Sequence, residues 1–578
     1  MAKGGKDSAA AQGGIVMRID LLYLDDFKNL KNFEVDFDLK SSRQVIVGRN
    51  GVGKSNLLEA IAQIFRDLDL EEAPDSPTAF GYRIEYYCNG HFVRIASARQ
   101  QPDDPKFPFA RTYEIAPDGG NAEAEKDART YGTISQSEFY RRNRPLKTDA
   151  GNEPNPERLL PLYVFGYYSG VSGRFNDVFA RHEELYYKQQ IKGEEAPLRP
   201  LFLAKPHHSQ FSLLSFFAAN DETAKTFLRE EFRIAGLDSV LIALHEPYWN
   251  KRRKRTGEGE GDHRFWRTGG KVSPLLDSLF AHALAPMAGE EKIKISLGQE
   301  PSKERRFLYL QSQEALQAVA QGLQPKEFFS RLESAIFSDV VSSEGDDVRI
   351  RVKLTDAAVP VLFKELSEGE QQLLTLIGLM RFTAQNESLF LLDEPDTHLN
   401  PAWCLDYLSN LRKYGVEPQN SQILVTTHSP LTFAGLEKQE VVIIERQSDD
   451  RIISYHPTSH PKGMGFAAIL TSELFGLRAA LDHETLQKID EKRELAFKEP
   501  KTDVDRQKLA ALNEELGRLD FTKSVRDPLY LEYVHAMTKA QQEHPEIEEP
   551  APSMPIWEAR KKIAEDIAKR LLEKGAKQ

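Results

Sequence analysis

One glycine-rich segment constrains the fold of this chain more than any other: Gly48 to Ser55 reads GRNGVGKS and fits the pattern G-x-x-x-x-G-K-[ST]. The apolar run 44–47 precedes it, and a helical pattern begins at Asn56. Such a loop lets backbone N–H groups approach phosphate oxygens at a helix N-terminus. The segment therefore predicts a strand, loop and helix within a parallel sheet that binds nucleotide phosphates.

The chemistry of this loop assigns roles to two of its side chains. Lys54 is expected to neutralise the β- and γ-phosphates, and Ser55 is the expected magnesium ligand. The predicted ligands are thus ATP and Mg²⁺. The predicted ATP-binding residues are Arg49, Asn50, Gly51, Val52, Gly53, Lys54, Ser55 and Asn56.

Two acidic residues follow a second apolar run. Residues 389–392 are typical of a buried parallel strand, and the carboxyl end of such a strand delivers Asp393 and Glu394 to a ligand crevice. Asp393 is expected to hold Mg²⁺, directly or through water, and Glu394 to be the catalytic residue that polarises the attacking water. The alternative is a strand that simply ends in solvated acids.

A histidine ends a third apolar run. Residues 422–427 predict a strand, and His428 follows it in the sequence VTTHSP. An imidazole at the carboxyl end of a strand can hydrogen-bond a γ-phosphate and respond to its presence. We predict that role for His428, although a lone histidine is often only a satisfied polar residue.

The segment 366–372, LSEGEQQ, predicts a second anion site. Ser367 and Gly369 stand at the start of a helical run, where N–H groups and a hydroxyl face an anion. Because the P-loop already serves its own nucleotide, this site is expected to serve the nucleotide of another subunit. A serine-capped helix without a ligand is the alternative for this segment alone.

Together the four segments resemble the ATP-binding-cassette class, in the LSxGE form of SMC, Rad50 and RecF proteins. The resemblance implies an α/β, RecF/SMC-like P-loop ATPase head and a head-to-tail homodimer, or a higher even oligomer, around two ATP molecules. It also implies a D-loop at Asp396 that crosses the same interface. The implied trans contacts with ATP are Ser367, Glu368, Gly369 and Glu370. The class usually adds a magnesium-sensing glutamine, for which Gln100, Gln101 and Gln136 are equal candidates.

Composition restricts the partners and the cellular location of a protein with these motifs. Acidic residues outnumber basic ones, 88 against 76, which gives a net charge of −12 and disfavours uniform coating of DNA. Cys88 and Cys404 stand far apart and predict neither a disulfide framework nor a metal site. No apolar run approaches the roughly 20 residues of a membrane helix. We therefore expect a cytoplasmic protein that does not bind a membrane.

Pattern changes along the chain suggest its organisation. Alternation in 17–24 and 33–38 predicts an antiparallel hairpin, and no heptad run predicts a coiled-coil arm. Residues 1–16 are expected to be a flexible tail. The remaining predicted regions are an N-terminal ATPase lobe (17–158), a mainly helical insertion or lid (159–363), a C-terminal ATPase lobe (364–460) and a helical extension for partner docking (461–578).

A basic run interrupts the predicted insertion. Five consecutive cations are followed by an acidic, glycine-rich stretch and flanked by aromatic residues. Such a run can grip phosphates and stack a base, or it can be a solvated hairpin tip. The candidate nucleic-acid contacts are Lys251, Arg252, Arg253, Lys254 and Arg255.

The region after His428 predicts no nuclease. A fused TOPRIM nuclease would need an apolar strand ending in Asp-x-Asp, but Asp503-Val504-Asp505 lies in a charged helical pattern. The turn Tyr167–Gly170, the step HSP and the charged C-terminal helices resemble PtuA-type ATPases of Septu anti-phage systems and their retron-associated relatives. The resemblance implies an ATPase subunit that regulates a separate HNH nuclease. A RecF-like DNA-repair ATPase acting directly on DNA is the alternative.

Overall fold

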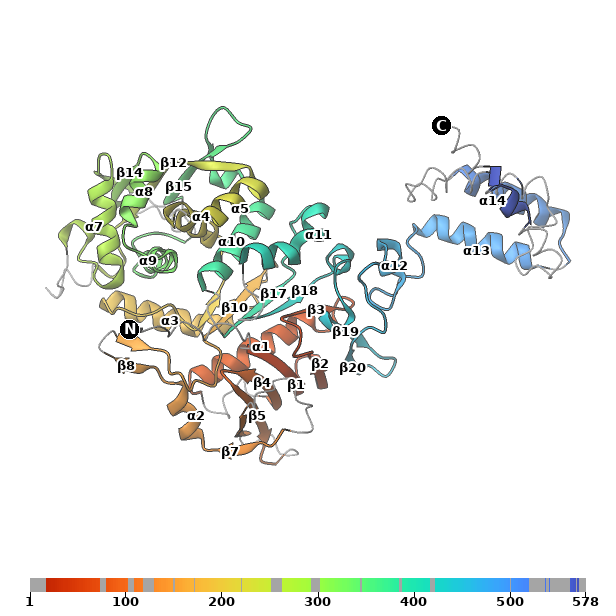
Figure 1. Cartoon of the computed structure of the whole chain (residues 1–578), viewed down its shortest axis with the longest axis horizontal. Coiled ribbons are helices and arrows are strands. Elements are labelled where there is room, and N and C mark those ends of the chain that lie inside the picture. The colour runs from red at the N-terminus through yellow and green to blue at the C-terminus, as the bar shows by residue number, and fades with distance from the viewer. Residues whose placement is uncertain are drawn as a thin grey trace, which may run out of the picture. The chain divides into compact units, whose positions relative to one another are not determined.

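The strand that leads into the P-loop lies inside a mixed sheet of seven strands formed by residues that the structure, a computed structural model, describes (Figure 1). Its strands are β3 (Arg43–Val47), β10 (Tyr163–Tyr168), β11 (Leu201–Leu203), β17 (Ser388–Asp393), β18 (Ser421–Thr426), β19 (Val441–Arg446) and β20 (Ile452–Tyr455). The order is β11-β10-β17-β18-β3-β19-β20. All neighbours are parallel except β19 and β20.

The structure describes most of the chain, with gaps. The described residues are 17–72, 80–101, 109–117, 129–148, 151–170, 172–219, 221–250, 262–292, 302–343, 346–383, 387–415, 421–498, 500–518, 536, 540, 562–567 and 569–570.

Both faces of the central sheet are buried, which explains the continuous apolar runs. In β17, Leu389 and Leu391 face one core, whereas Phe390 and Leu392 face the other. Period-two alternation separates the two faces of a strand. Helix α1 (Lys54–Asp69) covers the first face, and α10 (Glu368–Thr383) packs in the core of the second. The parallel strands therefore keep one carboxyl edge for a ligand.

An antiparallel sheet closes the core on the α1 side. Its strands, among the described residues, are β1 (Met17–Phe27), β2 (Leu30–Asp36), β4 (Tyr82–Cys88), β5 (His91–Arg99), β6 (Phe109–Pro117) and β7 (Gly132–Ile134). The predicted hairpin is confirmed by the pairing of β1 with β2. The backbone N–H of Ile19 donates to Gln422 Oε1 over 2.8 Å and ties this sheet to β18. Helix α2 (Gln136–Asn143) and the hairpin of β8 (Leu146–Thr148) and β9 (Gly151–Glu153) follow.

Residues 159–363 correct the prediction of a mainly helical insertion. Strands β10 and β11 belong to the central sheet, so the insertion does not begin at residue 159. A further antiparallel sheet follows the order β13-β14-β12-β15-β16. Its strands are β12 (Ile234–His245), β13 (Met287–Lys292), β14 (Ser302–Leu310), β15 (Val348–Leu354) and β16 (Val361–Leu362). The accompanying helices are α3 (Asn176–Lys192), α4 (His207–Ala219), α5 (Glu222–Phe232), α7 (Ser273–His282), α8 (Gln313–Val319) and α9 (Pro325–Phe337).

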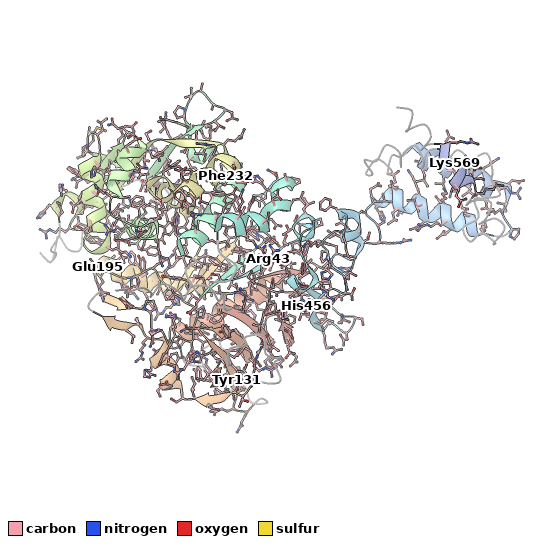
Figure 2. All side chains as sticks on the ribbon, in the orientation of Figure 1. Arg43, Tyr131, Glu195, Phe232, His456 and Lys569 are labelled. Carbon is pink, nitrogen blue, oxygen red and sulfur yellow. The ribbon has the colours of Figure 1, made fainter. Side chains whose placement is uncertain are left out.

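The chain divides into two units after Gly476, later than the boundary predicted at residue 461. The first unit ends with α11 (Pro401–Asn410), β18 to β20 and α12 (Phe466–Thr471). Arg43, labelled in Figure 2, pairs with Glu440 over 2.6 Å and fixes the start of β3 to the segment before β19. The second unit contains α13 (His483–Phe497) and α14 (Asp503–Arg518), joined by ion pairs such as Lys488 with Glu515. None of the helices in the described ranges is long and apolar enough to cross a membrane.

The contact between α10 and α4 gives a test of the core. A β-carbon added at Gly378 would lie 2.2 Å from Ser212 Oγ, and Ser212 is fully buried. We expect Gly378→Ala to lower the free energy of unfolding of the first unit by about 1–3 kcal/mol, because close-packed cores resist added volume. The measurement is the melting temperature of the whole chain.

The matched control is Gly435→Ala, since an added β-carbon there meets nothing within 4 Å. Equal melting temperatures for the two variants would contradict this account of the contact between α4 and α10.

Candidate nucleotide site

The backbone of the P-loop has little room for side chains. A β-carbon on Gly48 would lie 2.2 Å from the carbonyl oxygen of Ile444 in β19, and Gly53 adopts φ +104° at the N-cap of α1. Only glycine takes such a φ without strain. Glycines at these positions let the loop place the N-terminus of a 16-residue helix at the sheet edge. The arrangement matches the predicted phosphate cradle.

Lys54 lies at the centre of this cradle. Its Nζ donates to the carbonyl oxygen of Gly48 over 2.9 Å, and the residue is only 6% exposed. Burial lowers the pKa of the Lys54 ammonium, while the carboxylates of Glu394 and Asp393 act in the opposite direction. A buried cation held by neutral carbonyls and two nearby acids is well placed to exchange those partners for phosphate oxygens.

The residues predicted to hold magnesium are brought together. Ser55 Oγ donates to Asp393 Oδ1 over 3.0 Å, although the two residues are far apart in sequence. Thr426, the last residue of β18, donates its hydroxyl to the same carboxylate oxygen. A hydroxyl and one carboxylate are the small oxygen set that Mg²⁺ uses when phosphates and waters complete its shell. The donor set therefore fits the expected ion.

Glu394 and His428 face each other across the ends of β17 and β18. His428 Nε2 lies 3.0 Å from Glu394 Oε1, and both side chains are about 40% exposed, as needed for access to a ligand. Burial and the nearby Lys54 charge lower the pKa of His428, against the effect of Glu394. The lowered pKa favours the neutral imidazole, which can donate from Nε2 to Glu394 without carrying charge.

The backbone of Glu394 is strained. Its φ is +50°, a left-handed conformation that costs about 1–3 kcal/mol in a residue other than glycine. The N–H of Glu394 donates to the carbonyl oxygen and to the hydroxyl of Thr426, over 3.0 and 3.1 Å. These bonds hold the side chain at the sheet edge, where it can act on a water molecule.

A polar network that sequence reasoning did not assign supports the loop. Asn29 Nδ2 donates to the carbonyl oxygen of Gly51 over 2.8 Å, and Asn56 Nδ2 donates to Asn29 Oδ1 over 2.6 Å. Arg174 donates to Asn56 Oδ1 over 2.7 Å. Asn56 is thus a brace within the loop. Arg49 and Asn50 are exposed, while Val52 is buried beneath the loop.

The side chain of Asp396, the predicted D-loop residue, points inward. The side chain is 6% exposed, and its Oδ2 accepts hydrogen bonds from Thr427 and Thr432 over 2.5 and 2.7 Å. Two hydroxyls satisfy the carboxylate, so it turns inward and holds the loop that carries His428. The neighbouring Thr397 and His398 are the exposed residues of this turn.

The signature segment caps its own helix. The backbone N–H of Ser367 donates to Glu370 Oε2 over 2.7 Å, and the N–H of Glu370 donates to Ser367 Oγ over 3.3 Å. This reciprocal pair is a capping box. Glu368 is exposed, and a β-carbon on Gly369 would lie 2.5 Å from the carbonyl oxygen of His398. The signature therefore packs against the turn after Glu394, which Glu368 contacts at His398 and Gln372 at the carbonyl oxygen of Pro395, while Ser367 keeps its bonds within its own helix.

None of the three candidate glutamines occupies the sheet edge beside Asp393. Gln100 and Gln101 follow β5, and Gln136 opens α2, so all three belong with the antiparallel sheet. Asp393 is paired with Tyr168 of β10 on one side and with Thr426 of β18 on the other. The Tyr-Ser-Gly turn that the sequence singled out thus lies where the central sheet meets the site.

A histidine cluster resembles a metal centre, but its potential ligand atoms already make hydrogen bonds within the protein. The ligand atoms of His207, His208 and Glu333 lie within 4.8 Å of one another. However, the N–H of Lys205 donates to His208 Nδ1 over 2.7 Å, so Nε2 carries the proton that meets Glu333. Arg199 also donates to Glu333 over 2.9 Å. Both the tautomer and the arginine disfavour a cation here.

The predicted nucleic-acid contacts Lys251, Arg252, Arg253, Lys254 and Arg255 lie outside the described residues.

Comparison with known proteins places these motifs among ATPases. Residues 17–104 match a family described as "AAA ATPase domain", and residues 292–434 match one described as "AAA domain, putative AbiEii toxin, Type IV TA system". The chain carries AAA ATPase domains. The first match contains the P-loop, and the second contains the signature, Asp393, Glu394 and His428.

Two groups of curated relatives are similar to this chain. Septu protein PtuA of Bacillus mycoides is 31% identical over 26% of this chain and 22% of its own length. The Retron Ec83 probable ATPase of Escherichia coli is 23% identical over 89% of this chain and 87% of its own length. The Retron Vc95 probable ATPase of Vibrio cholerae is 27% identical over 24% of this chain and 30% of its own length. The chain is homologous to these proteins, although it spans less than a third of the Septu and Vc95 proteins.

The hydroxyl of Thr426 gives a test of the magnesium arrangement. Thr426→Val keeps the shape but removes the hydroxyl that contacts Asp393 and Glu394. We expect the Mg²⁺ concentration for half-maximal ATP hydrolysis to rise about tenfold or more, because groups that orient a ligand commonly have effects of that size.

The control is Thr471→Val, whose hydroxyl bonds only to carbonyls of its own helix. An unchanged magnesium dependence for Thr426→Val would show that this hydroxyl does not orient the metal ligand.

Proposed function

We propose that this chain is the ATP-hydrolysing subunit of an anti-phage defence complex, that two copies close head to tail around ATP and Mg²⁺, and that the closed state controls a separate nuclease. The observation that carries the proposal is the gathering of Lys54, Ser55, Asp393, Glu394 and His428 at one edge of the central sheet. The AAA ATPase domains and the homologous Septu and retron proteins support it.

The chemistry follows from this placement. Lys54 and the backbone of the P-loop would hold the phosphates, and Ser55 with Asp393 would hold the magnesium ion, which would supply the charge that neutralises them. Glu394 takes a proton from the attacking water, and His428 lies beside Glu394, where it contacts the γ-phosphate. Loss of the γ-phosphate removes its contact with His428. Hydrolysis therefore changes what His428 contacts at the carboxyl edge of the central sheet.

The signature supports a composite site made by two chains. Ser367 bonds only within its own helix among the described residues, to Glu370 and Gln371. A groove of about 1050 Å³ lies beside it, lined by residues that include Tyr168, Ser169, Glu368 and His398. We propose that the P-loop nucleotide of the partner approaches this groove and replaces the internal bond of Ser367.

The nuclease part of the proposal rests on family likeness. The resemblance to PtuA-type ATPases implies a separate HNH nuclease as partner. The charged helices α13 and α14, which form a unit apart from the ATPase core, are the proposed docking region.

Glu394→Gln tests the role of the base. The neutral side chain keeps the contact with His428 but accepts no proton, so we expect ATP turnover to fall at least about a hundredfold while ATP-bound dimers accumulate. Light scattering behind size-exclusion chromatography, with and without ATP, measures the mass. Retained turnover would contradict the assignment of Glu394.

The same trapped variant separates the defence proposal from a RecF-like repair function. We expect a neighbouring HNH gene product to co-purify with it in an ATP-dependent way. Binding to gapped DNA without any nuclease partner would instead favour direct action on DNA.

Glu370→Gln tests the signature. The Glu370 carboxylate holds the Ser367 hydroxyl and, in the proposed dimer, would stand close to the phosphates of the partner's nucleotide. Removal of its charge should tighten the ATP-dependent dimer by roughly three- to tenfold, because a partly screened like-charge repulsion is lost.

The readout for Glu370→Gln is the protein concentration at which half of the chains dimerise with ATP. Glu222→Gln, an exposed carboxylate on α5, is the charge-matched control. Weaker or unchanged dimerisation of Glu370→Gln would argue against a signature that contacts nucleotide in trans.

A further inference from the structure

A second cavity lies at the opposite edge of the central sheet from the nucleotide site. It has a volume of about 850 Å³, within the range of small-molecule sites. Leu162 and Tyr163 line it where β10 begins, and Pro200 lines it just before β11. The P-loop follows β3 and Asp393 ends β17, so both lie at the carboxyl ends of the parallel strands, away from this cavity. An occupant of this cavity therefore would not compete for the P-loop.

Arginines bind the carboxylates of this cavity. Four acidic residues line it, and each has its own guanidinium partner. The pairs are Asp69 with Arg158 at 3.2 Å, Glu71 with Arg144 at 2.9 Å, Glu327 with Arg331 at 2.7 Å, and Asp221 with Arg381. The lining acids are thus neutralised by arginines.

Two lysines add positive charge to this lining. Lys271 Nζ donates to uncharged groups, Ser330 Oγ at 2.9 Å and the carbonyl oxygen of Ala196 at 3.5 Å. Lys326 Nζ lies 5.0 Å from the centroid of the Tyr163 ring. Burial lowers the pKa of both ammonium groups. The carboxylates of Glu327 and Glu195 act in the opposite direction at Lys271, and the charge of Lys271 lowers the pKa of Lys326 further. An anion between them would relieve that repulsion.

The remaining lining is apolar and aromatic. Tyr140, Tyr163, Phe216 and Phe382 contribute rings, and leucines and prolines contribute much of the rest. Rings of this kind suit a flat, weakly polar body. Helix α9 begins at the cavity with Pro325 and has no side chain bonded at its N-cap, so its N-terminal dipole also favours an anion.

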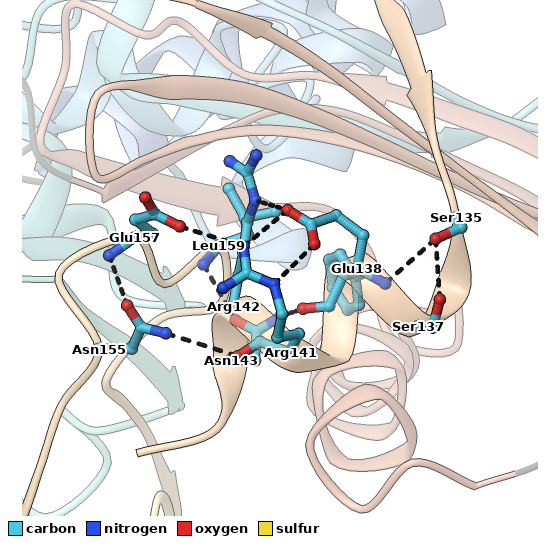
Figure 3. Close-up of polar contacts among 10 residues, drawn as sticks. Ser135, Ser137, Glu138, Arg141, Arg142, Asn143, Asn155, Glu157 and Leu159 are labelled. Atoms are coloured by element: carbon cyan, nitrogen blue, oxygen red, sulfur yellow. Dashed lines mark hydrogen bonds and ion pairs between the residues drawn. The ribbon is translucent and has the colours of Figure 1, made fainter. Parts of the chain in front are cut away.

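The wall contributed by α2 is held in place by hydrogen bonds. Asn143 Oδ1 accepts from the N–H groups of Leu159 and Leu160 over 3.0 and 2.9 Å (Figure 3). Glu138 binds both Arg141 and Arg142 on the same helix. Asn143 and Leu160 both line the cavity. The hydrogen bonds of Asn143 therefore fix this wall of the cavity before any ligand enters.

We propose that this cavity binds an organic phosphate with a planar body, such as a nucleoside monophosphate, with its phosphate between Lys271 and Lys326 and its ring among the aromatic side chains. This is a site additional to the P-loop and does not depend on the function proposed above.

Isothermal titration tests the proposal directly. The probes are AMP, GMP, CMP and UMP, titrated at millimolar concentration into the full chain with Lys54→Ala, which weakens the P-loop site. We expect one of them to bind with one site per chain. The double substitution Lys271→Ala and Lys326→Ala should then weaken that binding about tenfold or more, since hydrogen bonds to charged groups have effects of this size.

Three further arms make the outcome decisive. Lys462→Ala with Lys508→Ala removes two exposed lysines and should leave binding unchanged. Lys271→Arg with Lys326→Arg keeps the charges and should retain most of the affinity. Inorganic phosphate should bind more weakly than the mononucleotide. Absence of binding by all four mononucleotides, binding that ignores the two lysines, or equal binding of inorganic phosphate would each overturn the proposal.

Discussion

The carboxylate of Asp393 is the constraint on which the nucleotide site depends. It is almost fully buried, so it must find hydrogen-bond donors, and it finds them in the hydroxyls of Ser55 and Thr426. Ser55 belongs to α1, which precedes β17 in the sequence, and Thr426 belongs to β18, which follows β17. One acid thus fixes the P-loop helix, its own strand and the strand of His428 relative to one another.

Parallel strands give the molecule two unlike edges. At the carboxyl edge, short turns expose Glu394 and His428, while the amino edge meets the far ends of α1 and α10. These two helices begin at the P-loop and at the signature, and their last turns contribute Leu68, Arg381 and Phe382 to the second cavity. A helix of 16 residues spans about 24 Å, so each connects the two edges as one rigid element.

The sequence predicted the parts of the site that rest on local chemistry. The P-loop, Asp393, Glu394 and His428 follow strands or open helices, and short-range patterns were enough to place them at one edge. The inward turn of Asp396 was not predictable, because it depends on Thr427 and Thr432 from a distant segment. Strands β10 and β11 were assigned to an insertion for the same reason, since pairing with β17 is a long-range property. The brace of Asn29 and Arg174 likewise forms only on folding.

The contact between Gly48 and the carbonyl of Ile444 bears on how this protein is made. The strand beside the P-loop strand comes from a segment synthesised about 400 residues later. At the usual pace of translation, about 5–20 residues per second, the P-loop waits on the order of 20–80 s for that neighbour. During that time β3 lacks β18 and β19, the strands that flank it in the finished sheet. In nascent chains of this protein, β3 is therefore an apolar strand that lacks both flanking strands until β18, and then β19, has been synthesised.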